Sequence, residues 1–141
     1  YKNVEVAELE GKICGAIILI KGKDLSKLDL ITIIKLIKYI KGIKNKIRFL
    51  KDVILELGLN ECEKNEFYIA NLATLEEYRG KGIGKALIKL AEESAKKAGY
   101  KSCSLLAKDA GVKSFYEKLN FVFEEEEPYY SHTLYRMIKV I

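Results

Sequence analysis

Residues 71–88 read NLATLEEYRGKGIGKALI, and this stretch decides the fold. Its first part has the apolar character of a strand, and its last part has the spacing of an amphipathic helix. Three glycines lie between the two parts and three cations flank them: Gly80, Gly82, Gly84, Arg79, Lys81 and Lys85. Glycine lets a backbone approach a ligand closely, and the helix that follows directs its free N–H groups toward the same point. The stretch therefore predicts a site for a phosphate or pyrophosphate; the alternative is a glycine-rich turn that serves packing only.

Two common phosphate-binding motifs do not fit this stretch. A P-loop needs a Ser or Thr after Gly-Lys to bind magnesium, but Ala86 follows Lys85 here. The dinucleotide-binding fingerprint needs a third glycine where this chain has Lys85 or Leu87. The sequence thus argues against a nucleoside triphosphatase and against a dinucleotide-binding domain.

Hydrophobic periodicity extends the pattern in both directions. Before the glycines it predicts a hairpin of strands 4–8 and 13–20, helices 25–41 and 45–57, and a strand at 66–75. After them it predicts a helix with the apolar stripe Ile83, Ala86, Leu87, Leu90, Ala91, Ala95 and Ala98, then a strand at 101–108, a short helix at 112–119, and strands 121–126 and 134–141 with a turn at Pro128. Gly42 separates the first two helices, and Gly58 with Asn60 marks the end of the second. This alternation of strands and helices indicates a mixed α/β sheet.

The charge of the chain is concentrated in one segment. Its 141 residues, 49% hydrophobic and 32% charged, suit a single soluble folded domain. Between Lys21 and Lys51, ten Lys or Arg residues stand against two Asp residues, a balance of +8, whereas the whole chain carries +5. Such a block suits nucleic acid, an acidic membrane surface or an anionic ligand. The alternative is a solvated, lysine-rich helix face.

Cysteine and histidine usage argues against metal binding. Cys14, Cys62 and Cys103 lie far apart, and His132 is the single histidine, so neither a zinc site nor a cysteine nucleophile is predicted. Buried free thiols indicate a reducing, cytoplasmic location. No signal peptide is visible, and charged residues interrupt the longest apolar stretch, 25–43, so no membrane span is predicted.

Two motifs resemble the GNAT family of N-acetyltransferases. Arg79 to Gly84 matches the family's Arg/Gln-x-x-Gly-x-Gly/Ala signature, and DAGVKSFYEKLNF at 109–121 resembles its Asn-x-x-Ala-x-x-Phe/Leu-Tyr-x-x-x-Gly-Phe block. The resemblance covers about residues 4–20 and 66–141. It implies a mixed, mostly antiparallel central sheet with helices on both faces and a splayed pair of parallel strands. Residues 1–141 would then be one acetyltransferase-like domain that lacks the family's first strand and first two helices and carries an added basic helical segment at about 21–65.

The same resemblance implies acetyl-coenzyme A as co-substrate and no metal. The cofactor would lie between the strands at 67–74 and 101–107, with its pantetheine arm paired to backbone near Leu72, Ala73 and Thr74 and its pyrophosphate held by N–H groups from Lys81 to Lys85. The full set of cofactor-binding residues that the resemblance implies is Leu72, Ala73, Thr74, Arg79, Gly80, Lys81, Gly82, Ile83, Gly84, Lys85, Asp109 and Tyr116.

The implied chemistry is direct attack of a primary amine on the thioester. Tyr116 stands where the family places the general acid that protonates the leaving thiolate; the alternative is a packing residue beside Phe115. Glu66 lies thirteen residues before Arg79, which is the position of a general base in one branch of the family. The alternatives are that Glu66 is a solvated strand-edge side chain, or that a chain of water molecules takes the proton instead. Asp109 and Asn120 replace the family's Asn and Gly, and Asn120 can still adopt a left-handed conformation.

The partners implied are acetyl-coenzyme A and an amine acceptor that the sequence does not identify. Two other functions stay open: a non-catalytic coenzyme A-binding or regulatory module, and a nucleic-acid or membrane-surface module that uses the basic segment 21–51. The latter has few aromatic side chains for base stacking, so no nucleic acid partner is expected. The oligomeric state is open, with a homodimer among the alternatives.

Overall fold

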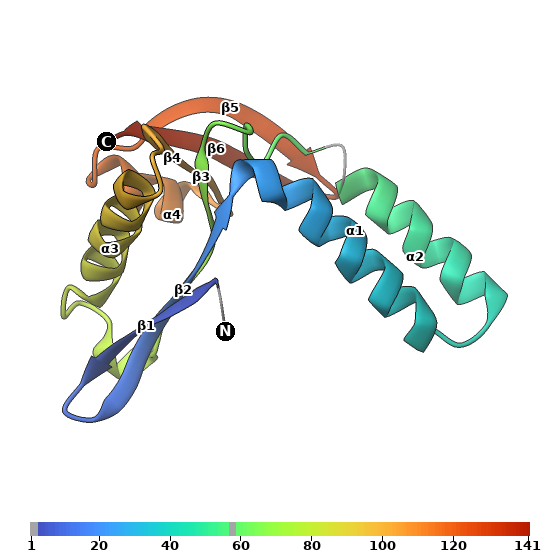
Figure 1. The fold of residues 1–141 in the computed structure, drawn as a ribbon, viewed down its shortest axis with the longest axis horizontal. Helices are drawn as coiled ribbons and strands as arrows, with labels where there is room; N and C mark the ends of the chain where they lie inside the picture. Colours follow the sequence, from blue (N-terminus) through green and yellow to red (C-terminus); the bar gives the residue numbers. More distant parts are fainter. Residues whose placement is uncertain (1–2, 57–58) are drawn as a thin grey trace.

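A mixed sheet forms the centre of the molecule (Figure 1), seen in a computed structural model that describes residues 3–56 and 59–141. The elements in chain order are β1 (Val4–Leu9), β2 (Lys12–Lys21), α1 (Gly22–Tyr39), α2 (Ile43–Glu56), β3 (Phe67–Thr74), the 3-10 turn η1 (Glu76–Tyr78), α3 (Ile83–Lys97), β4 (Ser102–Ala107), α4 (Ala110–Glu117), β5 (Val122–Tyr129) and β6 (His132–Val140). Across the described ranges the strand order is β1-β2-β3-β4-β6-β5. Every neighbouring pair is antiparallel except β3 and β4, which are parallel. The predicted mixed, mostly antiparallel sheet with one parallel pair is confirmed.

The core lies between this sheet and α3. Ile17, Leu105 and Met137 come from three strands and are fully buried. From α3 the buried residues are Leu87, Ile88, Ala91 and Ala95. The predicted stripe was wrong in part, because it omitted Ile88 and included Ala86 and Leu90, which are exposed. The stripe that faces the sheet is therefore rotated slightly around the helix.

The last hairpin differs from its prediction. Pro128 does not form the turn; it lies within β5 and is opposite Thr133 of β6. The turn follows at Tyr130, whose φ is +53°. Proline lacks the N–H that a central strand needs, but β5 is the edge strand of the sheet and tolerates the loss. An edge position cannot be recognised from the local sequence, and proline is common in turns, so the sequence alone predicts a turn there.

The basic segment forms a helical hairpin of α1 and α2, which we call the arm (residues 22–56). Figure 1 shows these helices side by side, projecting away from α3 and α4. The predicted break is confirmed at Gly42, where φ is +85°. The predicted end of the second helix at residue 57, with Gly58 as its signal, lies outside the described residues.

The base of the arm is fixed against the segment that leads into β3. The Gly22 N–H donates to the Glu66 carbonyl oxygen at 2.9 Å. A Cβ at Gly22 would overlap the Glu63 carbonyl oxygen and lie 2.8 Å from Cys62 Sγ, so only glycine fits there. The start of the arm and the start of β3 are thus held together.

Candidate functional site

The parallel strands β3 and β4 separate soon after they begin. Their register contains two pairs, Phe67 with Cys103 and Tyr68 with Ser104. Beyond these, the described part of β3 pairs with β2 alone up to Thr74. One backbone edge of β3 therefore faces the gap, and an extended ligand can pair with it in the manner of an added strand. Leu72, Ala73 and Thr74, which the family resemblance implies for the pantetheine arm, lie in this part of β3.

The glycine loop connects the open end of this gap to α3. Gly80 and Gly82 have φ of +75° and +81°, the left-handed region that glycine adopts without strain, and a Cβ at either would meet nothing within 4 Å. The first helical hydrogen bond runs from the Ala86 N–H to the Gly82 carbonyl oxygen at 3.0 Å. The N–H groups of residues 83–85 precede it and have no acceptor within the helix. These groups and the helix dipole suit an anion.

Gly84 has a different role from the two glycines before it. It lies inside α3 and its φ is not positive. A Cβ at Gly84 would lie 3.2 Å from Phe115 Cζ and 3.8 Å from a methyl carbon of Leu72. Gly80 and Gly82 have open surroundings that leave room for close ligand approach, which stays a prediction; Gly84 instead lets α3 pack closely on α4.

Positive charge surrounds the loop more fully than the sequence indicates. Arg79, Lys81 and Lys85 are exposed, and Lys81 Nζ lies 4.8 Å from the centroid of the Tyr78 ring. A cavity of about 560 Å³ next to the loop is lined by Lys85 and by three further cations: Lys89 of α3, Lys118 just after α4, and Lys139 of β6. Lys139 Nζ is bound to Glu92 Oε1 at 2.6 Å. Lys118 and Lys139 were missed because they lie far from the loop in sequence.

Asp109 caps a helix. Its Oδ1 accepts a hydrogen bond from the Val112 N–H at 2.8 Å, so its side chain satisfies a free donor at the start of α4. This gives a structural reason for Asp at the position, and the cofactor contact implied for Asp109 stays a prediction. Asn120, at the other end of α4, has φ of +66°, so its expected left-handed conformation is confirmed.

Tyr116 is 7% exposed and packs among aromatic rings. Its ring centroid lies 5.1 Å from that of Phe115 and 5.6 Å from that of Phe121, both in edge-to-face geometry. Burial raises the pKa of the Tyr116 phenol above its usual value, because the phenolate would lose hydration. The side chain therefore keeps its proton at neutral pH. Packing and acid catalysis are both compatible with this position, and the catalytic role stays a prediction.

Glu66 is buried at 4% exposure, so the alternative of a solvated strand-edge side chain is wrong. Arg136 Nη2 donates to both of its carboxylate oxygens, at 2.9 Å to Oε1 and 2.7 Å to Oε2. The Glu63 N–H donates to Oε2 at 2.9 Å. Arg136 Nη1 also forms an ion pair with Glu124. Within the described residues no hydrogen bond joins Glu66 to Tyr116, so the two predicted catalytic side chains belong to separate clusters.

Arg136 is the functional residue that sequence reasoning missed. It is 3% exposed and lies in strand β6, between Tyr135 and Met137. A cation flanked by apolar residues in a strand indicates a buried ion pair, because a charge is almost never buried without a partner. The sequence contained that signal but did not indicate which carboxylate pairs with Arg136.

A small acidic cavity contains the Glu66–Arg136 ion pair in its lining. It has a volume of about 320 Å³ and is lined by Asn60, Glu63, Glu66, Glu124, Glu125 and Arg136. Asn60 Nδ2 donates to Glu125 Oε1 at 2.6 Å. Four carboxylates against one guanidinium favour a cationic ligand.

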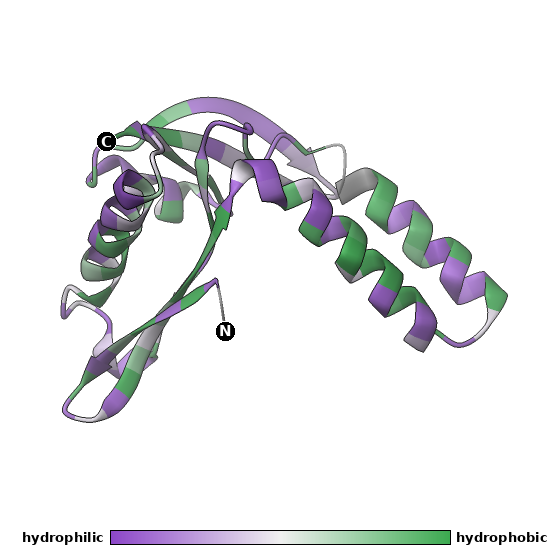
Figure 2. Cartoon of the chain, in the orientation of Figure 1, coloured by the Kyte–Doolittle hydropathy of each residue, from purple (hydrophilic) through white to green (hydrophobic). Residues whose placement is uncertain are grey.

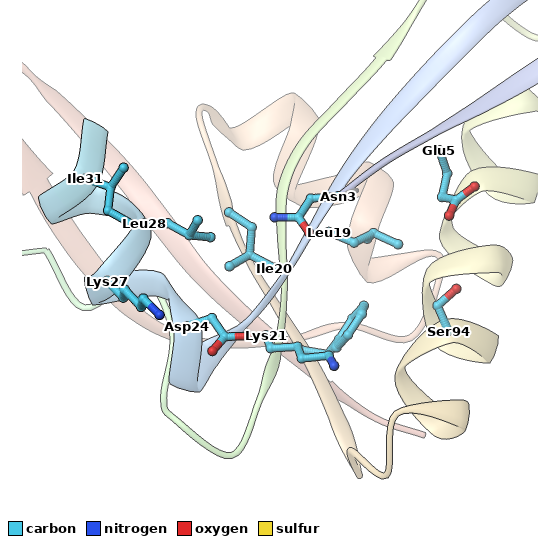
Figure 3. Close-up of a pocket in the computed structure, with 11 residues that line it drawn as sticks. Asn3, Glu5, Leu19, Ile20, Lys21, Asp24, Lys27, Leu28, Ile31 and Ser94 are labelled. Carbon is cyan, nitrogen blue, oxygen red and sulfur yellow. The ribbon is translucent and has the colours of Figure 1, made fainter. Parts of the chain in front are cut away.

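A third cavity, of about 430 Å³, lies between the start of α1 and α3 (Figure 3). Figure 3 shows Leu28 and Ile31 of α1 on one side and Ser94 of α3 on the other. It contains none of the site residues that the sequence predicts. We therefore place the candidate site at the β3–β4 gap, the glycine loop and the acidic cavity.

Neither a metal centre nor a membrane span is present in the part of the chain that the structure describes. Across residues 3–56 and 59–141, His, Cys, Asp and Glu side chains form no group of three or more that could hold an ion. Within the same ranges no helix combines the length and apolar character needed to cross a bilayer.

A mixed sheet with one splayed parallel strand pair, followed by a glycine loop and a helix N-terminus, matches the acetyltransferase fold. The family model for the acetyltransferase (GNAT) domain matches residues 46–123, more than half of the chain. The chain therefore belongs to the GNAT acetyltransferase family. No curated protein matches the sequence.

Solved structures agree on the fold. An N-acetyltransferase from Staphylococcus aureus Mu50 has 23% identity and a TM-score of 0.68, with 98% of this chain and 70% of that chain covered. The Drosophila melanogaster polyamine N acetyltransferase has 14% identity and a TM-score of 0.67, covering 99% and 75%. A candidate streptothricin acetyltransferase from Bacillus anthracis, in complex with acetyl coenzyme A, has 18% identity and a TM-score of 0.65, covering 98% and 61%.

Proposed function

We propose that the protein transfers the acetyl group of acetyl-coenzyme A to a primary amine by direct attack in a ternary complex. The observation that carries this proposal is the backbone edge of β3, which faces the β3–β4 gap and leads through η1 to the left-handed glycines of the loop. A thioester cofactor with an amide-containing arm and a pyrophosphate fits both parts: the arm pairs with Leu72 to Thr74, and the pyrophosphate meets the N–H groups before Ala86.

In the proposed reaction the amine nitrogen attacks the thioester carbonyl carbon, and the carbon–sulfur bond breaks. The departing thiolate takes a proton from the Tyr116 phenol, which its buried position keeps protonated. The amine loses a proton to the base, for which Glu66 is the candidate. A carboxylate accepts hydrogen bonds at about four lone-pair sites, and Arg136 and the Glu63 N–H occupy three on Glu66. One site is left for a proton, delivered by the amine or by water.

The acidic cavity supports a cationic acceptor. Its carboxylates lie around Glu66 at the start of β3, next to the place where β3 and β4 begin to separate. An amine that carries a second positive charge gains favourable electrostatic interactions there, whereas an amine with a carboxylate does not. We infer that diamines, polyamines and lysine side chains in basic peptides are better acceptors than amino acids.

A non-catalytic coenzyme A-binding module is the second candidate. It is favoured by the structural roles already visible for both proposed catalytic side chains, since Tyr116 packs on Phe121 and Glu66 binds Arg136. Two measurements separate the candidates. We expect calorimetry to detect coenzyme A binding, and we expect thiol release from acetyl-coenzyme A when a diamine is added. Binding without release across a panel of amines would favour the module, and no binding at millimolar coenzyme A would contradict both.

Gly82→Ala should weaken coenzyme A binding about tenfold. A left-handed backbone costs a residue with a Cβ about 1–2 kcal/mol, and the strain is relieved by moving the N–H groups that the pyrophosphate needs. Calorimetric titration with coenzyme A measures the change. Gly99→Ala is the matched control, because Gly99 has φ of +82° at the opposite end of α3 and an equally open surrounding. Equal affinities of the two variants would contradict a loop site.

A further inference from the structure

The arm presents a surface that the proposed acetyl transfer does not use. Its two helices project from the sheet (Figure 1). Among the arm's described side chains, nine large apolar ones are exposed: Leu30, Ile31, Ile34, Leu36, Tyr39, Ile43, Ile47, Leu50 and Ile54. Single exposed apolar residues are ordinary, but a group of this size on one projecting element indicates a contact surface.

The most regular part of this surface lies on α2. Four exposed residues follow each other at intervals of four, three and four: Ile43, Ile47, Leu50 and Ile54. This spacing places them along one face of a helix. We call them the α2 stripe. Val53, outside the stripe, is buried, and with Phe49 it lines the space between α2 and α1. The stripe is thus not the face that packs within the arm.

Four cations border the stripe from its start to Lys51, namely Lys44, Lys46, Arg48 and Lys51, and the acidic Asp52 follows them near its C-terminal end. Figure 2 shows hydrophobic and hydrophilic residues following one another along both helices of the arm. The segment from Lys21 to Lys51 carries a balance of +8, while the remaining residues carry −3. The excess of positive charge therefore lies in the segment that bears the exposed apolar residues.

We propose that the arm binds an anionic membrane surface. The α2 stripe enters the boundary between headgroups and acyl chains, and the bordering cations contact lipid phosphates and carboxylates. An amphipathic helix with an aliphatic face and Lys or Arg along its borders lies in the plane of such an interface, and its binding adds apolar burial to electrostatic attraction. This proposal is independent of acetyl transfer, because the arm contains none of the proposed catalytic or cofactor-binding residues.

The charge and composition of the arm argue against two other binding partners for the α2 stripe, namely a second copy of the chain and nucleic acid. A second copy docked stripe to stripe would bring Lys44, Lys46 and Lys51 of both copies together, and their like charges would oppose the pairing. Nucleic acid would use the cations but not the exposed isoleucines, and base stacking requires aromatic side chains. Among the described side chains of the arm, Tyr39 is the exposed aromatic.

Sedimentation with lipid vesicles tests the proposal. The full chain is mixed with phosphatidylcholine vesicles that contain either no phosphatidylserine or about one-third phosphatidylserine. We expect binding to the anionic vesicles, little binding to the neutral ones, and loss of binding as salt rises from about 0.1 M to about 0.5 M. Ile47→Glu combined with Ile54→Glu should reduce the bound fraction at least about tenfold. Both side chains are exposed, and circular dichroism checks that the helices persist.

The matched control has the same number of substitutions and the same change of charge. Val122→Glu combined with Val140→Glu alters two equally exposed aliphatic side chains outside the arm and should keep vesicle binding. Equal loss in both double variants, or no binding to anionic vesicles at low salt, overturns the proposal. A dimer in sedimentation that the Ile47→Glu and Ile54→Glu changes dissociate, or salt-sensitive binding to duplex RNA or DNA that they leave intact, would overturn it in favour of a second copy or of nucleic acid.

Discussion

Tyr116→Phe should lower the turnover of acetyl transfer about 100-fold, within the range that a positioned general acid contributes. The substitution removes one oxygen and keeps the ring, so the edge-to-face contacts with Phe115 and Phe121 persist. Coenzyme A affinity and thermal stability should therefore stay close to those of the unsubstituted protein. Thiol release with a diamine acceptor measures turnover, and calorimetry measures affinity.

The pH profile adds a readout that packing alone would not move. Burial raises the pKa of Tyr116, so the phenol loses its proton only at a pH above its usual pKa, and the alkaline fall in turnover that this causes should be absent from Tyr116→Phe. Tyr100→Phe is the control, since Tyr100 is half-buried and packs on Phe67, with a ring separation of 5.4 Å. If the two variants show the same turnover and the same alkaline limb, Tyr116 serves packing only.

The fold was accessible from sequence because its signals are local. The change from strand to helix at residues 71–88 and the break at Gly42 each depend on neighbours within a few positions. The errors arose where position in the sheet decides the outcome. Pro128 is tolerated because β5 is an edge strand, and Ile88 is buried because α3 turns that face toward the sheet. Neither fact is encoded in the adjacent residues.

The candidate site likewise has a part that local sequence signals predict and a part that depends on tertiary structure. The loop glycines and the cations Arg79, Lys81 and Lys85 form a contiguous motif, so this part of the proposed anion site could be predicted, whereas Lys118 and Lys139 could not. The acidic cavity could not be predicted, because it brings together the start of β3 with β5 and β6. Its central pair, Glu66 and Arg136, is 70 residues apart in the sequence. Composition identifies the carboxylates as available, but only tertiary pairing shows that one buried guanidinium organises Glu66 and Glu124.

Arg136→Met should lower the free energy of unfolding by about 3–5 kcal/mol. The loss would leave the Glu66 carboxylate, 4% exposed, without its main partner, and an unpaired buried charge costs more than the pair contributes. Urea denaturation measures the change. Lys139→Met is the control: its ion pair with Glu92 is partly solvated, and such pairs contribute about 1 kcal/mol or less. Similar losses of unfolding free energy in Arg136→Met and Lys139→Met would contradict a special structural role for the buried Glu66–Arg136 pair.

Glu66→Gln separates the structural role of this pair from its chemistry. The carbonyl oxygen of glutamine can still accept the two hydrogen bonds that Oε2 accepts, from Arg136 and the Glu63 N–H, while the bond at Oε1 is lost. Arg136 keeps Glu124, so the stability loss should be less than half that of Arg136→Met. Replacing both partners, with Glu66→Leu and Arg136→Met, should recover much of the stability because no unpaired charge remains at this position. If Glu66→Gln is folded but loses turnover at saturating coenzyme A, the carboxylate takes part in proton transfer; unchanged turnover would assign it to structure, with water as the base.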